Sequence, residues 1–239
     1  MRIDTNTLCL GLFGNPLAHS LSPRLYNYIL QKKGLNYVYL PFAIPEDRLK
    51  EGINAIRSLN FRGVNVTIPY KEAVIPFLDD ISPEAAACGA VNVISNEEGR
   101  LCGYNTDGRG FVAALREAGI PIKGQVVFIG AGGAARSLAW ALAAEGVSRL
   151  DFMDINPERA EALAASLKVP ESTNLVAHVM GEEKFSELAV SSNIIINCSP
   201  IGMYPNVDKS PVSTVDTLNP AAVVCDIIYN PLTTKFLAL

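Results

Sequence analysis

The segment Gln125–Ala135 (Gln-Val-Val-Phe-Ile-Gly-Ala-Gly-Gly-Ala-Ala) joins an apolar strand to a glycine turn, and an apolar helix follows. The turn fits the pattern GxGxxA, in which one glycine permits the tight turn, one admits a pyrophosphate, and a small residue lets the helix pack. The first N–H groups of such a helix, with the positive end of its dipole, face the phosphates. The alternative is a tight strand-to-helix turn without a ligand. We expect a dinucleotide-binding unit, with cofactor contacts at Gly130, Gly132, Gly133 and Ala134.

The next strand, Arg149–Met153, is followed by Asp154, and this carboxylate bears on the choice of cofactor. An acidic residue about 20 positions past the glycines binds the adenosine ribose hydroxyls in units of this kind. Asn156 can cap the next helix by itself, so we expect Asp154 to be free for the ribose. A carboxylate there repels a 2′-phosphate, and we therefore expect NAD to be favoured over NADP, although Arg159 can offset the repulsion.

Strand and helix signals alternate along the chain, which is typical of an α/β fold with a parallel sheet. A helix is expected from Gly108 to Ala118, and it forms the natural seam between two domains. We therefore expect an N-terminal α/β substrate-binding domain over residues 1–107 and a C-terminal Rossmann domain over residues 108–239. Within the first domain, Asn96–Gly99 has the composition of a hairpin turn.

The composition indicates a compact globular protein and excludes several functional classes. Of 239 residues, 49% are apolar, and the net charge of −4 gives no basic surface for nucleic acid. No apolar run is long enough to span a membrane, and the N-terminal residues do not resemble a signal peptide. The five cysteines are scattered without a CxxC pair, which argues against disulfides and a zinc site and favours a reducing cytoplasm. We expect no metal site, with His19 supporting its loop and His178 at the surface.

Two serines precede the first expected helix, in His19-Ser20-Leu21-Ser22-Pro23. Ser20 and Ser22 are spaced to share one anionic ligand, such as a carboxylate, beside a helix N-terminus. The alternative is that Ser22 simply caps the helix before Pro23, as serine often does. The sequence leaves both interpretations open.

The segment Val64–Lys71 (Val-Asn-Val-Thr-Ile-Pro-Tyr-Lys) carries the first candidate catalytic group. Period-two alternation turns Asn65 and Thr67 to one face of a strand, and Thr67 lies at its carboxyl end, where open α/β sheets bind ligands. Lys71 follows closely, and Asp107 supplies a carboxylate from a later polar segment. A lysine near a strand end is usually a solvated surface residue. Beside a nicotinamide site, however, a lysine and an aspartate are the groups that a coupled hydride and proton transfer needs.

A series of segments carries a resemblance to a known family: Gly14–Pro23 (Gly-Asn-Pro-Leu-Ala-His-Ser-Leu-Ser-Pro), Asn65–Lys71, Gly89–Asn92 (Gly-Ala-Val-Asn), Asn105–Gly108 (Asn-Thr-Asp-Gly), the glycine turn, Asn197–Met203 (Asn-Cys-Ser-Pro-Ile-Gly-Met) and Asp226–Pro231 (Asp-Ile-Ile-Tyr-Asn-Pro). In this order they resemble the shikimate dehydrogenase family, including its quinate/shikimate relatives, over essentially the whole chain. Members of the family reduce 3-dehydroshikimate reversibly to shikimate, in aromatic amino acid biosynthesis, with a nicotinamide cofactor. The resemblance implies a substrate domain and a Rossmann domain that face each other across a cleft.

The resemblance also implies a role for each candidate site residue. Ser20 and Ser22 are expected to hold the substrate carboxylate. The groups expected around the ring are Thr67, Lys71, Asn92 and Asp107, with Tyr229 approaching from the Rossmann domain and Met203 covering the nicotinamide. Lys71 and Asp107 are the family's catalytic pair. Hydride addition to the C3 carbonyl leaves an alkoxide that an ammonium group can stabilise and protonate, and Asp107 is expected to keep Lys71 charged, because burial favours a neutral lysine.

Two departures from the family pattern keep alternatives open. Many members carry Asn-Arg-Thr where this chain has Asp154-Ile155-Asn156, and that arginine binds the 2′-phosphate of NADP, so the replacement again favours NAD. Family members also continue past Leu239, and we expect either a truncated sequence or a protein that lacks part of its site. The alternatives are an NAD-dependent quinate/shikimate dehydrogenase and a non-catalytic NAD-binding module. Whether the protein is a monomer or a homodimer stays open.

Overall fold

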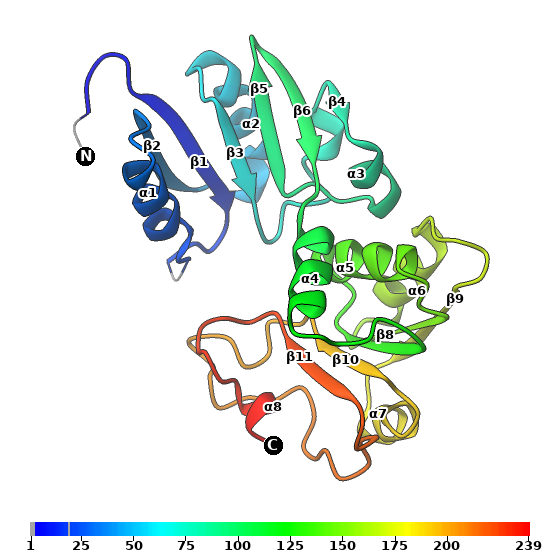
Figure 1. The fold of residues 1–239 in the computed structure, drawn as a ribbon. Coiled ribbons are helices and arrows are strands. Elements are labelled where there is room, and N and C mark those ends of the chain that lie inside the picture. Colours follow the sequence, from blue (N-terminus) through cyan, green and yellow to red (C-terminus); the bar gives the residue numbers. More distant parts are fainter. Residues whose placement is uncertain (1–2, 19) are drawn as a thin grey trace. The chain divides into compact units, whose positions relative to one another are not determined.

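The computed structural model describes residues 3–18 and 20–239. The chain divides into two compact units, each built around its own sheet (Figure 1). The first unit runs to Ala86 and continues from Ala90 to Thr106, and the second comprises Ala87–Gly89 and Asp107–Leu239. Within the described residues, no helix is both long and apolar enough to cross a membrane.

The first unit contains a mixed sheet. Its strands are β1 (Leu8–Gly14), β2 (Tyr37–Ala43), β3 (Gly63–Val66), β4 (Asp80–Ile81), β5 (Val93–Glu97) and β6 (Arg100–Tyr104), in the spatial order β2-β1-β3-β5-β6-β4. β1 runs parallel to β2 and β3, β4 runs parallel to β6, and β5 is antiparallel to both of its neighbours. The carboxyl ends of β1, β3 and β6 and the amino end of β5 therefore lie along one side of the sheet, which we call the first carboxyl edge.

Helices with apolar faces cover this sheet. They are α1 (Ser22–Lys32), α2 (Leu49–Ser58) and α3 (Pro83–Cys88), with the 3-10 turns η1 (Glu46–Arg48) and η2 (Ile75–Phe77). In α2, Leu49, Ile53 and Ile56 recur at helical spacing and are almost completely buried, so this face anchors the helix to the core. The core continues through Phe13 of β1 and Val64 of β3.

The predicted hairpin is confirmed between β5 and β6. Its turn is Glu98-Gly99, and both residues have positive φ, 54° and 91°, as a two-residue connection that matches the twist of the strands requires. The buried Asn96 closes the turn, because its Oδ1 accepts the Gly99 N–H at 2.9 Å. The hairpin returns the chain along β6 to the first carboxyl edge.

The second unit contains a parallel sheet of five strands, β7 (Gln125–Ile129), β8 (Arg149–Asp154), β9 (Asn174–Val179), β10 (Ile194–Asn197) and β11 (Val223–Asp226), in the order β11-β10-β7-β8-β9. The direction of winding reverses between β7 and β10. Doubly wound sheets bind ligands outside the carboxyl ends of the strands at such a reversal. The sheet confirms the predicted Rossmann-type unit, and we call this side the second carboxyl edge.

The helices of the second unit are α4 (Asp107–Glu117), α5 (Gly133–Ala144), α6 (Pro157–Ser166), α7 (Glu182–Ala189) and α8 (Lys235–Ala238) (Figure 1). α4 begins one residue before its predicted start, so Asp107 is its first residue. α4 and α5 pack closely, because a Cβ on Gly108 would lie only 2.3 Å from Ser137 O. Phe185 and Leu188 of α7 pack on one face of the sheet.

Candidate active site

Ser20 and Ser22 follow β1 and stand at the amino end of α1. The helix begins at Ser22 itself, and its N-cap position is Leu21, which makes no side-chain cap. The capping interpretation of Ser22 is therefore wrong, because this residue lies inside the first turn. The Ser22 N–H donates to Ser20 Oγ at 3.3 Å, so the two serines are held as a pair beside the helix terminus. This placement is compatible with the anion-binding interpretation, which stays a prediction.

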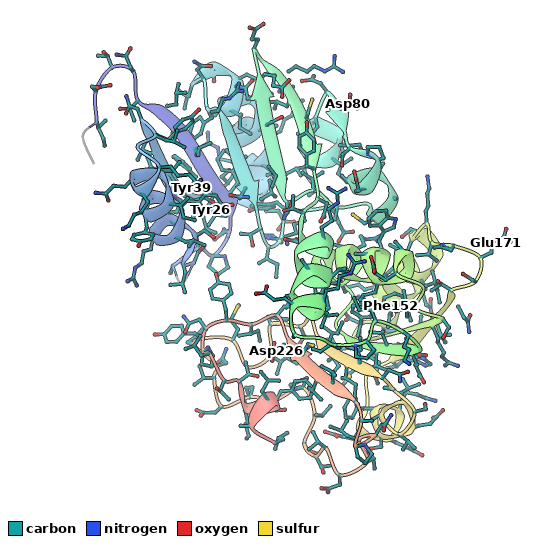
Figure 2. The ribbon with its side chains drawn as sticks, viewed as in Figure 1. Tyr26, Tyr39, Asp80, Phe152, Glu171 and Asp226 are labelled. Carbon is teal, nitrogen blue, oxygen red and sulfur yellow. The ribbon has the colours of Figure 1, made fainter. Side chains whose placement is uncertain are left out.

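A buried tyrosine, Tyr39 of β2, organises the polar groups behind the serine pair. Its hydroxyl donates to Asn65 Oδ1 at 2.9 Å, and its ring stacks on Tyr26 of α1 with the centroids 4.5 Å apart (Figure 2). Burial raises the pKa of Tyr39 well above its usual range, Tyr26 raises it further, and a hydrogen bond with Ser22 offsets part of the rise. Tyr39 is therefore a neutral, fixed hydrogen-bonding group at physiological pH.

Asn65 belongs to the same network, although its sequence context assigned it no role. Its Oδ1 accepts from Tyr39, and its Nδ2 donates to Asn92 O at 3.4 Å. The available signal was an amide on a strand whose neighbours are valines, on the same face as Thr67. A half-buried amide in such a position needs partners. The structure therefore adds Asn65 to the candidate substrate groups.

Thr67 and Lys71 follow β3 at the first carboxyl edge. The Thr67 N–H continues the parallel ladder to β1 with a bond of 2.8 Å. A Cβ on Gly14 would lie 2.4 Å from Thr67 Cγ2, so a glycine at the end of β1 makes room for the threonine side chain. The Lys71 carbonyl accepts the Val91 N–H at 2.7 Å, which fixes the lysine backbone beside the residue that precedes Asn92.

Asn92 connects the start of β5 to the segment that follows β6. Its Oδ1 accepts the Thr106 N–H at 3.0 Å, and its Nδ2 donates to Thr106 Oγ1 at 3.0 Å. Asn92 is buried, and buried amides are stable only when hydrogen-bonded. Because Thr106 immediately precedes Asp107, the asparagine fixes the backbone from which the predicted catalytic carboxylate projects.

The glycine turn connects β7 to α5 as predicted. Gly130 has φ +98°, and a Cβ there would lie 2.9 Å from Ser199 N, in the loop after β10. Gly130 is therefore required both by its left-handed backbone and by the close approach of that loop. Gly132 is the N-cap of α5, and Gly133 and Ala134 begin its first turn. The first N–H groups of α5 have no intrahelical partner and lie at the second carboxyl edge.

The backbone at Gly132 leaves room for an anionic group. We consider a Cβ built on Gly132 and leave out its chain neighbours. Among the described residues, the only group within 4 Å of this Cβ is the Arg159 guanidinium, at 3.5 Å. Arg159 lies in the first turn of α6 and is exposed. A helix N-terminus and a guanidinium together favour a phosphate. These residues fit a dinucleotide pyrophosphate.

Asp154 is less free than expected, because two backbone N–H groups already bind it. Its Oδ2 accepts the Ala131 N–H at 2.8 Å, and its Oδ1 accepts the Asn156 N–H at 2.9 Å. Asn156 caps α6 as predicted, by accepting the Glu158 N–H at 3.0 Å. The carboxylate is engaged because two backbone donors lie within hydrogen-bond reach of the end of β8. Asp154 therefore holds the glycine turn, and its contact with the ribose stays a prediction, because each carboxylate oxygen can accept a further hydrogen bond.

Met203 and Tyr229 lie in the loops that follow β10 and β11. Their exposed fractions, 38% and 52%, leave both side chains open to a ligand. The two loops are joined directly, because the Tyr204 N–H donates to Asn230 O at 3.1 Å. Both candidates therefore lie on the same side of the sheet as the glycine turn.

His178 is largely buried rather than at the surface, with a side-chain exposure of 13%. Its Nε2 lies 2.7 Å from Asp151 Oδ1, and the fully buried Asp151 also accepts hydrogen bonds from Arg149 and Gln125. Burial alone raises the pKa of Asp151, but the bonds from Arg149, His178 and Gln125 outweigh it and hold this pKa below its usual value. The cluster braces β7, β8 and β9. His19 lies outside the described residues.

The structure thus gathers the predicted residues into two sets. The first carboxyl edge carries Ser20, Ser22, Thr67, Lys71 and Asn92. The second carboxyl edge carries Gly130, Gly132, Gly133, Ala134, Asp154, Met203 and Tyr229. Asp107 stands at the start of α4, directly after the last residue of the first unit.

Relatives of known activity resemble this chain over its whole length. The family profile described as "Shikimate dehydrogenase substrate binding domain" matches residues 12–94. A curated shikimate dehydrogenase (NADP(+)) from Syntrophomonas wolfei is 57% identical over 239 residues, which cover 100% of this chain and 82% of that protein. Identity at this level over two domains exceeds what a shared fold alone produces.

Solved structures agree with the sequence relatives. The shikimate 5-dehydrogenase from Listeria monocytogenes, in complex with shikimate and NAD, aligns with a TM-score of 0.85 and 34% identity over 100% of this chain and 84% of its own. The shikimate 5-dehydrogenase from Thermus thermophilus, in complex with NADP(H) and shikimate, aligns with a TM-score of 0.83 and 36% identity over 97% and 83%. This chain therefore belongs to the shikimate dehydrogenase family of oxidoreductases.

Proposed function

We propose that this chain interconverts 3-dehydroshikimate and shikimate, with NAD or NADP as the cofactor. The observation that carries the proposal is the 57% identity, over the full chain, to a protein named for that activity. Two features of the molecule support it independently. The first carboxyl edge presents hydroxyl, amide and ammonium groups suited to a polyhydroxy acid, and the glycine turn suits a dinucleotide.

In this proposal the serine pair binds the substrate carboxylate. Two hydroxyl donors beside the amino end of α1 favour an anion, because the helix dipole and the first N–H groups add positive potential there. Tyr39 holds Asn65 and contacts Ser22, so these groups are positioned before the substrate arrives. Thr67 and Asn92 then contact the ring hydroxyls.

Lys71 is proposed as the proton donor during reduction of the carbonyl. Its ammonium stabilises the oxyanion that forms at C3 and transfers a proton to it, and the reverse transfer occurs when shikimate is oxidised. Asp107 is proposed to orient Lys71 and to keep it charged. The backbone supports this pairing. The Val91 N–H donates to Lys71 O, and Asn92, the residue after Val91, accepts the N–H of Thr106, the residue before Asp107.

The nicotinamide dinucleotide supplies the hydride acceptor and donor. Gly130 and Gly132 leave space for its pyrophosphate, and the first N–H groups of α5 neutralise part of its charge. The preference for NAD rests on the Asp154 carboxylate and on Ile155, which is 80% exposed and offers no charge to a 2′-phosphate. Arg159 acts in the opposite direction, because a guanidinium next to Gly132 favours phosphate. We therefore propose that both dinucleotides are used.

Initial-rate oxidation of shikimate and of quinate, each with NAD and with NADP, tests the proposal. We expect turnover of shikimate, and we expect Lys71→Ala to lower kcat by about 10²- to 10⁴-fold with a smaller change in KM. Lys50→Ala is the matched control, because it removes an exposed lysine of α2 from the same unit.

The binding of dinucleotide separates the possible outcomes. The single tryptophan, Trp140, lies in α5, directly after the glycine turn, so its fluorescence reports on the second unit. Dinucleotide binding without turnover of either acid would favour a non-catalytic binding module. A Lys71→Ala variant with the kcat of the Lys50→Ala control would remove Lys71 from the catalytic role.

A further inference from the structure

The carboxylate of Asp226 joins the two loops that follow β10 and β11. We propose that Asp226 is a positioning residue: it fixes the loop that carries Met203 to the loop that carries Tyr229. The proposal rests on the proposed function, because it assigns the position of two residues expected to face the nicotinamide and the substrate. It adds a residue to the site that touches neither ligand.

The contacts of Asp226 reach both loops. Its Oδ2 accepts from Asn197 Nδ2 at 3.1 Å and from Thr234 Oγ1 at 2.7 Å, and its Oδ1 accepts the Ile228 N–H at 3.0 Å. Asn197 ends β10, while Ile228 and Thr234 flank Tyr229 in the segment after β11. Figure 2 shows Asp226 at the end of β11. The Asp226 carboxylate thus holds the end of β10 and both ends of the loop that follows β11.

Asn197 transmits this contact to the loop that carries Met203. Its Oδ1 accepts from Ser199 N at 3.0 Å and from Ser199 Oγ at 2.7 Å, and its Nδ2 also donates to Ile201 O at 3.3 Å. The side chain is completely buried, so its orientation is fixed by Asp226 on one side and by the loop on the other. Both polar atoms of the amide are used, and a rotation of the amide would break every one of these bonds.

Backbone bonds repeat the connection farther along the loops. The Ile227 N–H donates to Asn197 O at 3.2 Å, and the Tyr204 N–H donates to Asn230 O at 3.1 Å. Met203 directly precedes Tyr204, and Tyr229 directly precedes Asn230. A shift of either loop therefore moves the backbone next to the other candidate residue.

Packing alone does not fix these two side chains. Met203 and Tyr229 are exposed, whereas the groups that hold their loops, Asn197 and Thr234, have an exposure of 0%. The precision of the site on this side therefore comes from a buried polar network. Charge-assisted bonds of this kind are stronger than neutral ones and have defined directions.

The variant Thr234→Val tests the proposal, because valine has the shape of threonine but lacks the hydroxyl donor. Thr173→Val is the matched control. Thr173 is also buried in the second unit, and its Oγ1 donates to Val147 O at 2.8 Å, at the opposite ends of the strands. Thr173→Val loses this one bond, whereas Thr234→Val loses the bond to Asp226 and also the cap of α8, in which Thr234 Oγ1 accepts the Leu237 N–H at 3.4 Å. We therefore expect a somewhat larger loss of thermal stability for Thr234→Val.

We expect only Thr234→Val to lower the kcat for shikimate, by about tenfold, which corresponds to about 1.4 kcal/mol. We expect the dissociation constant of the dinucleotide to change less than kcat does, because Asp154 and α5 hold the glycine turn, whereas Met203 is the cofactor candidate in the loosened loops. Hydrogen–deuterium exchange is expected to rise in residues 199–206 and 227–232 together. Equal kcat values in the two variants, or faster exchange in residues 227–232 alone, would overturn the proposal.

A reciprocal exchange guards against a variant that does not fold. Asp226→Asn replaces one of the two acceptor oxygens by an NH2 group, so either Asn197 Nδ2 and Thr234 Oγ1 or the Ile228 N–H loses its acceptor. Adding Asn197→Asp restores a carboxylate–amide bond in the opposite direction, with loss of the bond to Ile201 O. We expect the double variant to recover kcat relative to Asp226→Asn, and a lack of recovery counts against the connection. If the wild-type protein oxidises no shikimate, the proposed function fails, and the exchange rates of the two loops alone decide the role of Asp226.

Discussion

Replacement of Gly130 by alanine tests whether the glycine turn is constrained by its backbone angle or by the loop after β10. Gly130 has φ +98°, and Gly146, which follows α5, has φ +95°. An alanine with such an angle costs about 1–2 kcal/mol at either position. Apart from its chain neighbours, a Cβ on Gly146 meets no atom of the described residues within 4 Å, whereas one on Gly130 lies 2.9 Å from Ser199 N and 3.0 Å from Cys198 C. Gly146→Ala is therefore a control for the angle alone.

The steric contribution is the difference between the two variants. Backbone atoms cannot rotate away as a side chain does, so the loop at Cys198 and Ser199 has to move, at a further cost of about 1–3 kcal/mol. We expect Gly146→Ala to lose about 1–2 kcal/mol of unfolding free energy and Gly130→Ala about 2–5 kcal/mol. Only Gly130→Ala is expected to weaken dinucleotide binding, by at least about tenfold, because its displaced turn no longer presents the N–H groups of α5.

Urea unfolding followed by Trp140 fluorescence measures this difference. The signal reports on the second unit, which matters because a chain of two units need not unfold in one step. Titration with NADP on the same signal gives the dissociation constant. Equal losses of stability for Gly130→Ala and Gly146→Ala, together with unchanged binding, would refute the steric argument.

Three further substitutions test charged groups of the second unit. Asp151→Asn should destabilise the protein by about 2–3 kcal/mol at pH 7. Because the folded pKa lies below the usual 3.8, this difference should begin to shrink as urea-unfolding measurements move below about pH 4 and should vanish only below the folded pKa. Asp154→Asn should weaken NAD and NADP binding by similar factors, since it loosens the glycine turn, and a selective gain for NADP would instead indicate repulsion of a 2′-phosphate. Arg159→Leu should raise the KM for NADP more than that for NAD, and equal changes would exclude a phosphate contact.

Local sequence patterns predicted the elements whose geometry depends on near neighbours. Gly130 and the apolar strand before it identified the Rossmann-type unit, because a glycine turn between a strand and a helix is a local requirement. Asn96–Gly99 identified the hairpin for the same reason. The helix at Asp107 was placed within one residue, since Gly119 terminates it.

The errors arose where a residue's partner comes from a distant part of the chain. His178 was expected at the surface because its flanking residues are polar, yet its partner Asp151 lies 27 residues away in sequence. β9, the strand that carries His178, was not predicted, because its half-buried edge position gives a weak alternation of polar and apolar residues. Ser22 is a separate, local case: the sequence left capping and anion binding both open, and the structure excludes the cap because the helix begins at Ser22 itself.

Asp154 and Asp226 show why an acidic residue at the end of a strand is ambiguous in sequence. Each ends a parallel strand of the second sheet, each lies near a predicted cofactor contact, and each resembles a ligand-binding carboxylate by position. In the structure both oxygens of each carboxylate accept hydrogen bonds from the protein, so their first effect is to fix the loops after β7, β8, β10 and β11. A loop that approaches a ligand cannot be covered by apolar packing, and a strand-end carboxylate supplies the directional bonds that packing cannot. The sequence shows the carboxylate, whereas only the distances from the neighbouring backbone N–H groups show whether it holds a ligand or a loop.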